Sequence, residues 1–219
     1  LNENLVKGNL GISYLNPKEN SFFLECTLRL PESSNNNSFL FYSVKSGEGN
    51  EKIGYAVFLR QSSNADTKST IGFILMNGLE YSVVETSISK GFWHNLSFIY
   101  DRSSSQQKIY IRSVTNTLAE STFFKFNSID TEDSAFHIGT GESINLGSFN
   151  FELPSSQNTF NGYLDEVRLF HVLRKNSEIE YYSKRNIFAH DNLKLLFRFN
   201  EPSGSYSNND IVLDHSGKS

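Results

Sequence analysis

Short segments in which every second side chain is apolar recur along this chain. The segment 21–31 reads SFFLECTLRLP; its even-numbered positions are Phe, Leu, Cys, Leu and Leu, and positions 25, 27 and 29 carry Glu, Thr and Arg. The same period recurs at 53–60, 70–76, 79–85, 94–101, 108–114 and 136–140. Because successive side chains of a strand point to opposite faces, this alternation predicts half-buried β-strands. The 19 Phe and 10 Tyr favour the same interpretation, since aromatic rings pack well on a pleated surface.

The segments between these predicted strands are rich in Gly, Asn, Asp and Ser, which favour turns. Asn77 and Gly78 form a pair typical of a type I′ turn, so 70–76 and 79–85 are expected to form a hairpin. Only the segment 176–186, NSEIEYYSKRN, has the capping and charge pattern of a helix. Many short strands with frequent turns predict an all-β fold, either a two-sheet sandwich or a barrel.

Charge and cysteine content exclude several classes of protein. A formal net charge of -4 argues against a nucleic-acid-binding protein, which usually has a strongly basic face. The single cysteine, Cys26, allows no internal disulfide and no cysteine-based zinc site. No apolar run approaches the length of about 18 residues that a membrane-spanning helix needs, so no membrane insertion is expected. The chain starts without Met or a signal-peptide pattern, and we expect a processed form or a part of a longer protein.

Two longer stretches follow the pattern of a known family. Residues 91–114 read GFWHNLSFIYDRSSSQQKIYIRSV, and residues 160–179 read FNGYLDEVRLFHVLRKNSEI. They resemble a hairpin and the closing segment of laminin-G-like, concanavalin A-like jelly-roll domains. SFFLECTLRLPE at 21–32 is similar to an early strand of that family, although it lacks the family's Trp. The resemblance covers roughly residues 5 to 183 and implies a two-sheet antiparallel jelly-roll sandwich with one short C-terminal helix.

The C-terminal stretch 191–217, DNLKLLFRFNEPSGSYSNNDIVLDHSG, resembles the opening of the same kind of domain. An opening motif at this end has two interpretations. In the one that we prefer, residues 1–190 form one sandwich and 191–219 begin a second one in a tandem array. In the other, the strand within this stretch completes the first sandwich.

Asp165 and Glu166 are adjacent acids at the start of a predicted strand. Glycoside hydrolysis requires two carboxylates that face each other about 5 to 10 Å apart across the sugar. Adjacent residues of a regular strand point to opposite faces, so these two acids are not expected to act as such a pair. The E-x-D-x-E pattern of jelly-roll hydrolases is also missing from the sequence. We therefore expect no enzyme activity, and we expect Glu166 and Arg168 to form an ordinary charge pair.

Asp165 has two candidate roles. In the role that we prefer, its carboxylate accepts backbone N–H bonds from the turn at Asn161 and Gly162. The family resemblance offers the other role, because some laminin-G-like domains hold a calcium ion with acidic side chains and loop carbonyls. Asp165 is then the metal-ligand candidate, with Asp214 a weaker one, and structural Ca²⁺ is the only cofactor expected. Calcium takes about six to eight oxygen ligands, so either acid needs several helpers.

Trp93 and His94 suggest a ring that stacks on a sugar beside a polar partner. The family resemblance instead places both at the start of a core strand, and core packing is the interpretation that we prefer. Recognition is then expected in irregular loops, because loops vary while strands fix the scaffold. These loops are 33–38, 46–52, 62–69, 103–107 and 141–158.

By analogy with the family, the chain is expected to be a non-catalytic binding or adhesion module that recognises glycans or proteins within a larger surface or fibre protein. One alternative is a structural spacer or decoration domain of a viral particle or surface filament, and a jelly-roll glycoside hydrolase is the least favoured alternative. The expected partners are a glycan or protein ligand and neighbouring domains or subunits, with no nucleic acid. The expected location is extracellular, at a cell surface or at a virion surface.

Overall fold

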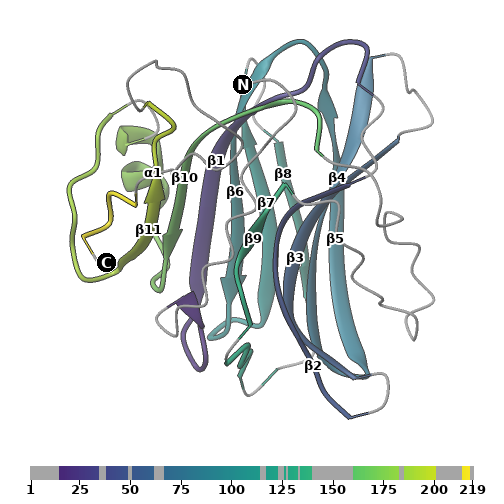
Figure 1. The fold of residues 1–219 in the computed structure, drawn as a ribbon, viewed down its shortest axis with the longest axis vertical. Helices are drawn as coiled ribbons and strands as arrows, with labels where there is room; N and C mark the ends of the chain where they lie inside the picture. The colour runs from purple at the N-terminus through teal and green to yellow at the C-terminus, as the bar shows by residue number, and fades with distance from the viewer. Residues whose placement is uncertain are drawn as a thin grey trace, which may run out of the picture.

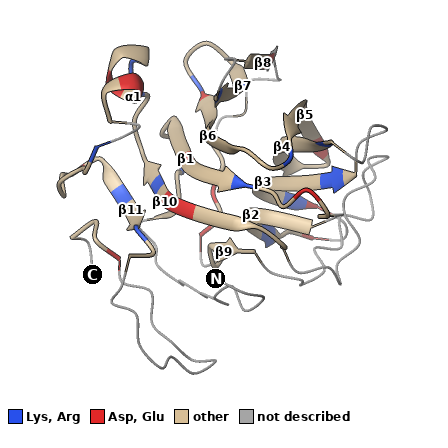
Figure 2. Ribbon diagram, turned by 90° about the horizontal axis from the view of Figure 1, so that it is seen from above, with Lys and Arg blue, Asp and Glu red and all other residues tan. Residues whose placement is uncertain are grey.

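The computed structural model places two antiparallel sheets face to face, with a short helix outside them (Figure 1). It describes residues 15–34, 38–48, 51–61, 67–113, 117–122, 126, 128–132, 134–139, 160–182, 185–200 and 214–217. Figure 2 shows where Lys and Arg and where Asp and Glu lie along the strands and the segments between them. No helix within the described ranges is long and apolar enough to cross a membrane.

One sheet has six strands in the order β11-β10-β1-β6-β7-β8. Their bounds are β1 (Phe22–Arg29), β6 (Trp93–Asp101), β7 (Gln106–Arg112), β8 (Thr117–Thr122), β10 (Tyr163–Phe170) and β11 (Leu193–Phe197). The other sheet has five strands in the order β5-β4-β3-β2-β9. Their bounds are β2 (Ser38–Ser46), β3 (Lys52–Gln61), β4 (Lys68–Gly78), β5 (Glu80–Ser89) and β9 (His137–Ile138). The predicted all-β sandwich is therefore confirmed.

The main core lies between the sheets and consists of the apolar faces that the alternation predicts. In β1, for example, Phe22, Leu24 and Leu28 are all fully buried in this cluster. Tyr55 of the facing sheet packs against Phe22, with the ring centroids 4.6 Å apart. Burial of a side chain of this size stabilises a fold by roughly 1.5 to 3 kcal/mol, so the aromatic content of the chain supplies much of the driving force.

The Tyr55 hydroxyl is a polar group inside this core. Tyr55 is fully buried, and its hydroxyl has no hydrogen-bond partner among the described residues. We expect Tyr55→Phe to raise the free energy of unfolding by about 1 kcal/mol, because the substitution removes an unpaired polar atom and keeps the ring. Urea denaturation measures the change, and Tyr181→Phe at a site that is 53% exposed is the control with no expected effect. A loss of stability in Tyr55→Phe would mean that the hydroxyl has a partner.

The hairpin between β4 and β5 is confirmed, but its turn is not the predicted one. Asn77 pairs with Glu80, so Gly78 and Leu79 are the two central residues. A type I′ turn needs positive φ at both central residues, and of these two only Gly78 has it, at 73°. Gly at the first central position is typical of a type II′ turn, and the predicted type I′ turn is therefore wrong.

Helix α1 (Asn176–Tyr182) forms where a helix is predicted and packs on the outer face of the six-stranded sheet. Ile179 is buried there against Phe23 and Phe170. The carboxylate of Glu178 accepts a 3.0 Å bond from the backbone N–H of Lys175, which satisfies one of the donors before the first turn. The helix therefore covers part of one sheet face and leaves the end of the sheet near Arg29 uncovered for the site described below.

The C-terminal strand belongs to this sandwich in the described structure. β11 pairs antiparallel with β10, with Val167 opposite Phe197 and Leu169 opposite Leu195. Leu195 and Phe197 lie in the main core. The arrangement matches the second interpretation of this stretch, in which the strand completes the sheet. The division of the chain into 1–190 and 191–219 stays a prediction.

The outer face of the five-stranded sheet carries a second apolar cluster. It consists of Phe39, Tyr42, Ala56, Phe58, Ile74 and Met76. All six side chains are buried. An open ligand-binding face would leave at least some of these side chains exposed, so this cluster does not form one.

Candidate binding site

Asp165 and Glu166 lie in an irregular part of β10. Where β10 pairs with β1, Asp165 of β10 lies opposite Thr27 of β1. Two positions earlier in β1, Glu25 lies opposite Arg168, which is three positions later in β10. β10 thus has one residue more than β1 between these two pairs, which defines a β-bulge. Glu166 lies within the bulge and has a φ of 50°. The bulge interrupts the alternation, so both acids are directed to the outer face, and the expectation that they point to opposite faces is wrong.

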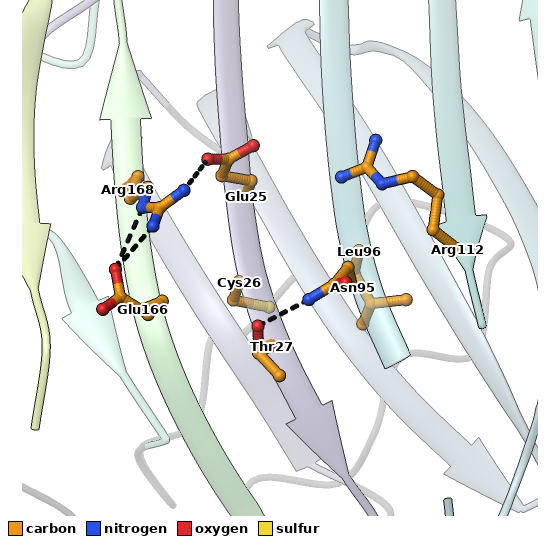
Figure 3. Close-up of a pocket in the computed structure, with 8 residues that line it drawn as sticks. All are labelled: Glu25, Cys26, Thr27, Asn95, Leu96, Arg112, Glu166 and Arg168. Carbon is orange, nitrogen blue, oxygen red and sulfur yellow. Dashed lines mark hydrogen bonds and ion pairs between the residues drawn. The ribbon is translucent and has the colours of Figure 1, made fainter. Parts of the chain in front are cut away.

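Glu166 is part of a buried ion network (Figure 3). The Arg168 guanidinium donates to Glu166 over 2.7 Å and to Glu25 over 2.8 Å, and the side chain of Arg168 is only 3% exposed. Arg174 donates to the same Glu25 oxygen over 3.1 Å. Arg168 also donates to the carbonyl of Tyr182, the last residue of α1. The ordinary charge pair predicted for Glu166 and Arg168 is therefore a structural network that ties the helix to the sheet.

Asp165 accepts a 2.8 Å bond from the backbone N–H of Glu166, its neighbour in the bulge. The preferred role of Asp165, with bonds from the turn at Asn161 and Gly162, stays a prediction. No three His, Cys, Asp or Glu residues gather into a possible metal site within the described ranges. Calcium takes six to eight oxygen ligands, which can include backbone and amide carbonyls, and Ca²⁺ at Asp165 stays a prediction.

Burial raises the pKa of the Asp165 carboxyl above 3.8, against the smaller lowering effect of the Glu166 N–H bond. An acid with a raised folded pKa holds its proton more tightly when folded, so stability falls as the pH rises from 3.8 through the folded pKa. The loss persists at neutral pH. We expect Asp165→Asn, which can still accept the Glu166 bond, to melt at a higher temperature than the parent near pH 7. Thermal melts should show a smaller difference in melting temperature between variant and parent at about pH 3. A lower melting temperature of Asp165→Asn than of the parent near pH 7 would contradict this prediction.

Asp214, the weaker candidate for a metal ligand, uses both carboxylate oxygens inside the chain. Oδ1 accepts from the backbone N–H of Leu196 over 3.0 Å and from that of Ser216 over 2.9 Å. Oδ2 accepts from the hydroxyl of Ser216 over 2.8 Å. These bonds give Asp214 a structural role at the edge of β11, and its role as a calcium ligand stays a prediction.

Three side chains form an exposed row across β10, β1 and β6. Arg29 lies opposite both Tyr163 and Trp93, in the two adjacent strands. Trp93 is 48% exposed and Tyr163 is 46% exposed. Their ring centroids are only 6.2 Å apart although β1 runs between them, so the rings lean toward each other. The Arg29 guanidinium lies 5.8 Å from the centroid of the Tyr163 ring and donates to the carbonyl of Gly91.

An open cleft of about 180 Å³ adjoins these rings, and we name it the Trp93 cleft. It is lined by Trp93, Gly162, Tyr163, Leu164, Asp165, Arg198, Phe199 and Asn200. The cleft thus combines two aromatic rings with a carboxylate, a guanidinium and an amide. Sites for small ligands typically combine mostly apolar walls with a small number of polar groups that point toward the ligand.

Two residues with positive φ lie in the Trp93 cleft or next to it, and Lys18, Ser105 and Glu132 have positive φ elsewhere. Phe199 has a φ of 51°, which bulky residues rarely adopt. Glu166, next to Asp165, has a similar value in the bulge. Such conformations cost free energy and gather at functional sites. In addition, Nε of Arg198 is buried without a hydrogen-bond partner among the described residues.

Trp93 and His94 have opposite environments. His94 is buried, and its Nε2 lies 2.8 Å from the carbonyl oxygen of Ser89, so core packing is confirmed for His94. The same expectation is wrong for Trp93, because Leu96, Phe98 and Tyr100 place the even-numbered positions of β6 in the core and the odd-numbered ones outside. Within the loops expected to carry recognition, residues 35–37, 49–50, 62–66 and 141–158 lie outside the described residues.

A larger cleft, of about 460 Å³, lies beside α1. Two of its charged groups bond within the protein: Arg174 donates to Glu25, and Glu178 accepts from the N–H of Lys175. Phe188, which is 84% exposed, is the most prominent apolar group of its lining. The Trp93 cleft, with an acid and an amide beside exposed rings, is therefore the better candidate for a polar ligand.

A scan of the chain against models of protein families gives no match, and a search of curated proteins gives none. Solved structures do match. A protein of Bacteroides ovatus that was proposed to bind carbohydrate superposes with a TM-score of 0.56 and 16% identity, over 91% of this chain and 50% of that one. This chain therefore spans half the length of that protein.

Two further structures have the same fold. The CBM40 domain of the Ruminococcus gnavus IT-sialidase, bound to α2,3-sialyllactose, has a TM-score of 0.51 and 12% identity, over 74% of this chain and 82% of that one. The heptameric SAP-like pentraxin of Limulus polyphemus has a TM-score of 0.50 and 14% identity, over 75% and 70%. At these identities the similarity shows the fold alone. The chain thus has the fold of laminin-G-like, concanavalin A-like jelly rolls, as the sequence resemblance implies.

Proposed function

We propose that this domain is a non-catalytic binding module that recognises a glycan in the Trp93 cleft. The observation that carries the proposal is the pair of half-exposed rings, Trp93 and Tyr163, beside the polar groups of Asp165, Arg198 and Asn200. A sugar ring offers an apolar C–H face and a rim of hydroxyls. Aromatic rings pack against the former, and the polar groups hydrogen-bond with the latter.

The size of the cleft supports a small ligand. Pockets for drug-sized ligands have volumes of roughly 300 to 1,000 Å³. The Trp93 cleft has about 180 Å³, which fits one sugar ring of a glycan better than an extended chain. The likeness of fold to a carbohydrate-binding domain of a sialidase supports the same class of ligand, although a fold by itself does not determine function.

The same geometry supports binding rather than hydrolysis. Glu166 is held by Arg168 on a face covered by α1, and Asp165 is the one carboxylate among the described residues that line the cleft. A pair of facing carboxylates, as glycoside hydrolysis requires, is therefore not formed by these two acids. An extracellular, cell-surface or virion-surface location fits a glycan-binding role and is part of the proposal.

Intrinsic fluorescence tests the proposal directly, because Trp93 is the single tryptophan of the chain. A glycan array with the isolated domain identifies candidate ligands. Each candidate is then titrated while the emission of Trp93 is followed. We expect a saturable change in emission, because a sugar that stacks on the ring removes water from it. A glycan that binds without any change in the emission of Trp93 would place the ligand elsewhere.

The structural spacer or decoration domain remains the second candidate. The exposed Phe188 beside the cleft at α1 favours contacts with a neighbouring domain or subunit. Concentration-dependent self-association in sedimentation experiments, together with no binding on the glycan array, would favour this candidate over a glycan-binding module.

A further inference from the structure

One wall of the Trp93 cleft is formed by Arg198, Phe199 and Asn200, which directly follow β11. β11 is the outermost strand of the six-stranded sheet, with β10 as its one neighbouring strand in that sheet. An edge strand has unpaired N–H and C=O groups along its free side and frays more easily than a central strand. The position of this wall therefore depends on what holds the free side of β11.

Asp214 and His215 hold the free side of β11 at Leu196. The side chain of Asp214 accepts from the N–H of Leu196 over 3.0 Å, and the N–H of His215 donates to the carbonyl of Leu196 over 2.9 Å. The backbone N–H and C=O of Leu196 are thereby both satisfied. The next residue, Phe197, forms a bridge with Asp214. Ser216 holds the carboxylate in place through its N–H and its hydroxyl.

Leu196 and Phe197, which Asp214 holds, are followed directly by the wall residues 198–200. Phe199 packs against Phe197, with ring centroids 6.0 Å apart, and it does so in a left-handed conformation. Arg198 donates to the carbonyl of Ile187 over 2.8 Å. A conformation of this kind persists only where its surroundings hold it, so a frayed β11 would release the wall.

We propose that Asp214 is a positioning residue for the Trp93 cleft: by holding Leu196 and Phe197 it fixes the wall from Arg198 to Asn200. The inference rests on the proposed glycan-binding function. It also gives the C-terminal stretch, whose motif resembles the opening of another domain, a part in the ligand site of this sandwich.

The test compares affinities for a glycan identified on the array, measured by calorimetry well below the melting temperature of each variant. We expect Asp214→Ala to weaken binding roughly fivefold or more, because the wall loses its fixed position. Asp214→Asn should recover most of the affinity, since its side-chain oxygen still accepts from Leu196. Ile71→Val, in the core strand β4 of the other sheet, is the control for destabilisation and should bind like the parent.

The outcomes separate the two proposals. If Trp93→Ala weakens binding and Asp214→Ala binds like the parent, Asp214 has no positioning role and the cleft remains the glycan site. If Trp93→Ala leaves binding unchanged, the proposed function itself fails. If Ile71→Val weakens binding as much as Asp214→Ala, the effect is one of general stability and the inference is overturned. Should Asp214→Ala not fold, Ser216→Ala removes one bond to the carboxylate and should give a smaller loss in the same direction.

Discussion

Replacing Trp93 with alanine should weaken glycan binding roughly thirtyfold while the sandwich stays folded. Truncation of an aromatic side chain at the centre of a binding site costs about 2 kcal/mol or more, which corresponds to that factor. Trp93 is 48% exposed, so its removal takes little area from the core. Calorimetry measures the affinity, because the variant has no tryptophan fluorescence.

Phe92 is the matched control for this experiment. It precedes Trp93, is 58% exposed and does not line the Trp93 cleft. Phe92→Ala should therefore bind like the parent, and Tyr163→Ala should lose affinity like Trp93→Ala. Equal losses in Phe92→Ala and Trp93→Ala would show that surface hydrophobicity, and not the cleft, drives binding.

Replacing Arg168 with methionine should reduce the free energy of unfolding by about 3 to 5 kcal/mol. Arg168 is 3% exposed and pairs with Glu25, whose side chain is 6% exposed. Removal of Arg168 leaves Arg174 as the remaining ion-pair partner of the buried Glu25 carboxylate. It also takes away the ion pair with Glu166 and the bond to the carbonyl of Tyr182. Urea denaturation of parent and variant measures the loss.

The exposed ion pair of Lys45 and Glu132 provides the contrast. Lys45→Met should change stability by less than about 0.5 kcal/mol, because solvent screens such pairs. Glu25→Gln should also reduce the free energy of unfolding, because Arg168 and Arg174 both donate to the same Glu25 oxygen. A loss below about 1 kcal/mol in Arg168→Met would show that the network is not a main link between α1 and the sheet.

The alternation of apolar residues predicts those strands whose faces differ clearly. β1, β3, β4, β5, β6 and β7 all form where the period of two occurs. β2 does not show this alternation, because it has a bulge near its start. At the bulge the adjacent residues Leu40 and Phe41 both lie in the main core. β8 reads TLAEST and lies at a sheet edge, so it has little apolar alternation to detect.

The candidate site was within reach of the sequence only in part. The alternation along β6 places its odd-numbered residues, Trp93, Asn95 and Ser97, on the outer face. This alternation is stronger evidence than the family pattern, which suggests a core position for Trp93. Asp165 does line the Trp93 cleft, although the sequence suggests only a bond to the turn or a metal ion for it. The bulge that turns Asp165 and Glu166 to the same face has no signature in the sequence, because it is defined by the register with β1.

By itself, the alternation in the sequence determined an all-β fold and the two faces of each regular strand, because burial of alternate side chains is a local property. The choice of a sandwich over a barrel came from the family resemblance. The sequence also determined that the stretch after 190 contains a strand. Tertiary structure alone decided that β11 joins the edge of β10 and that Asp214 covers its free side. Trp93, Tyr163 and Arg198 come from distant parts of the chain, and pairing across the sheet brings them to one cleft. Strand order depends on contacts between distant segments, which no local period records.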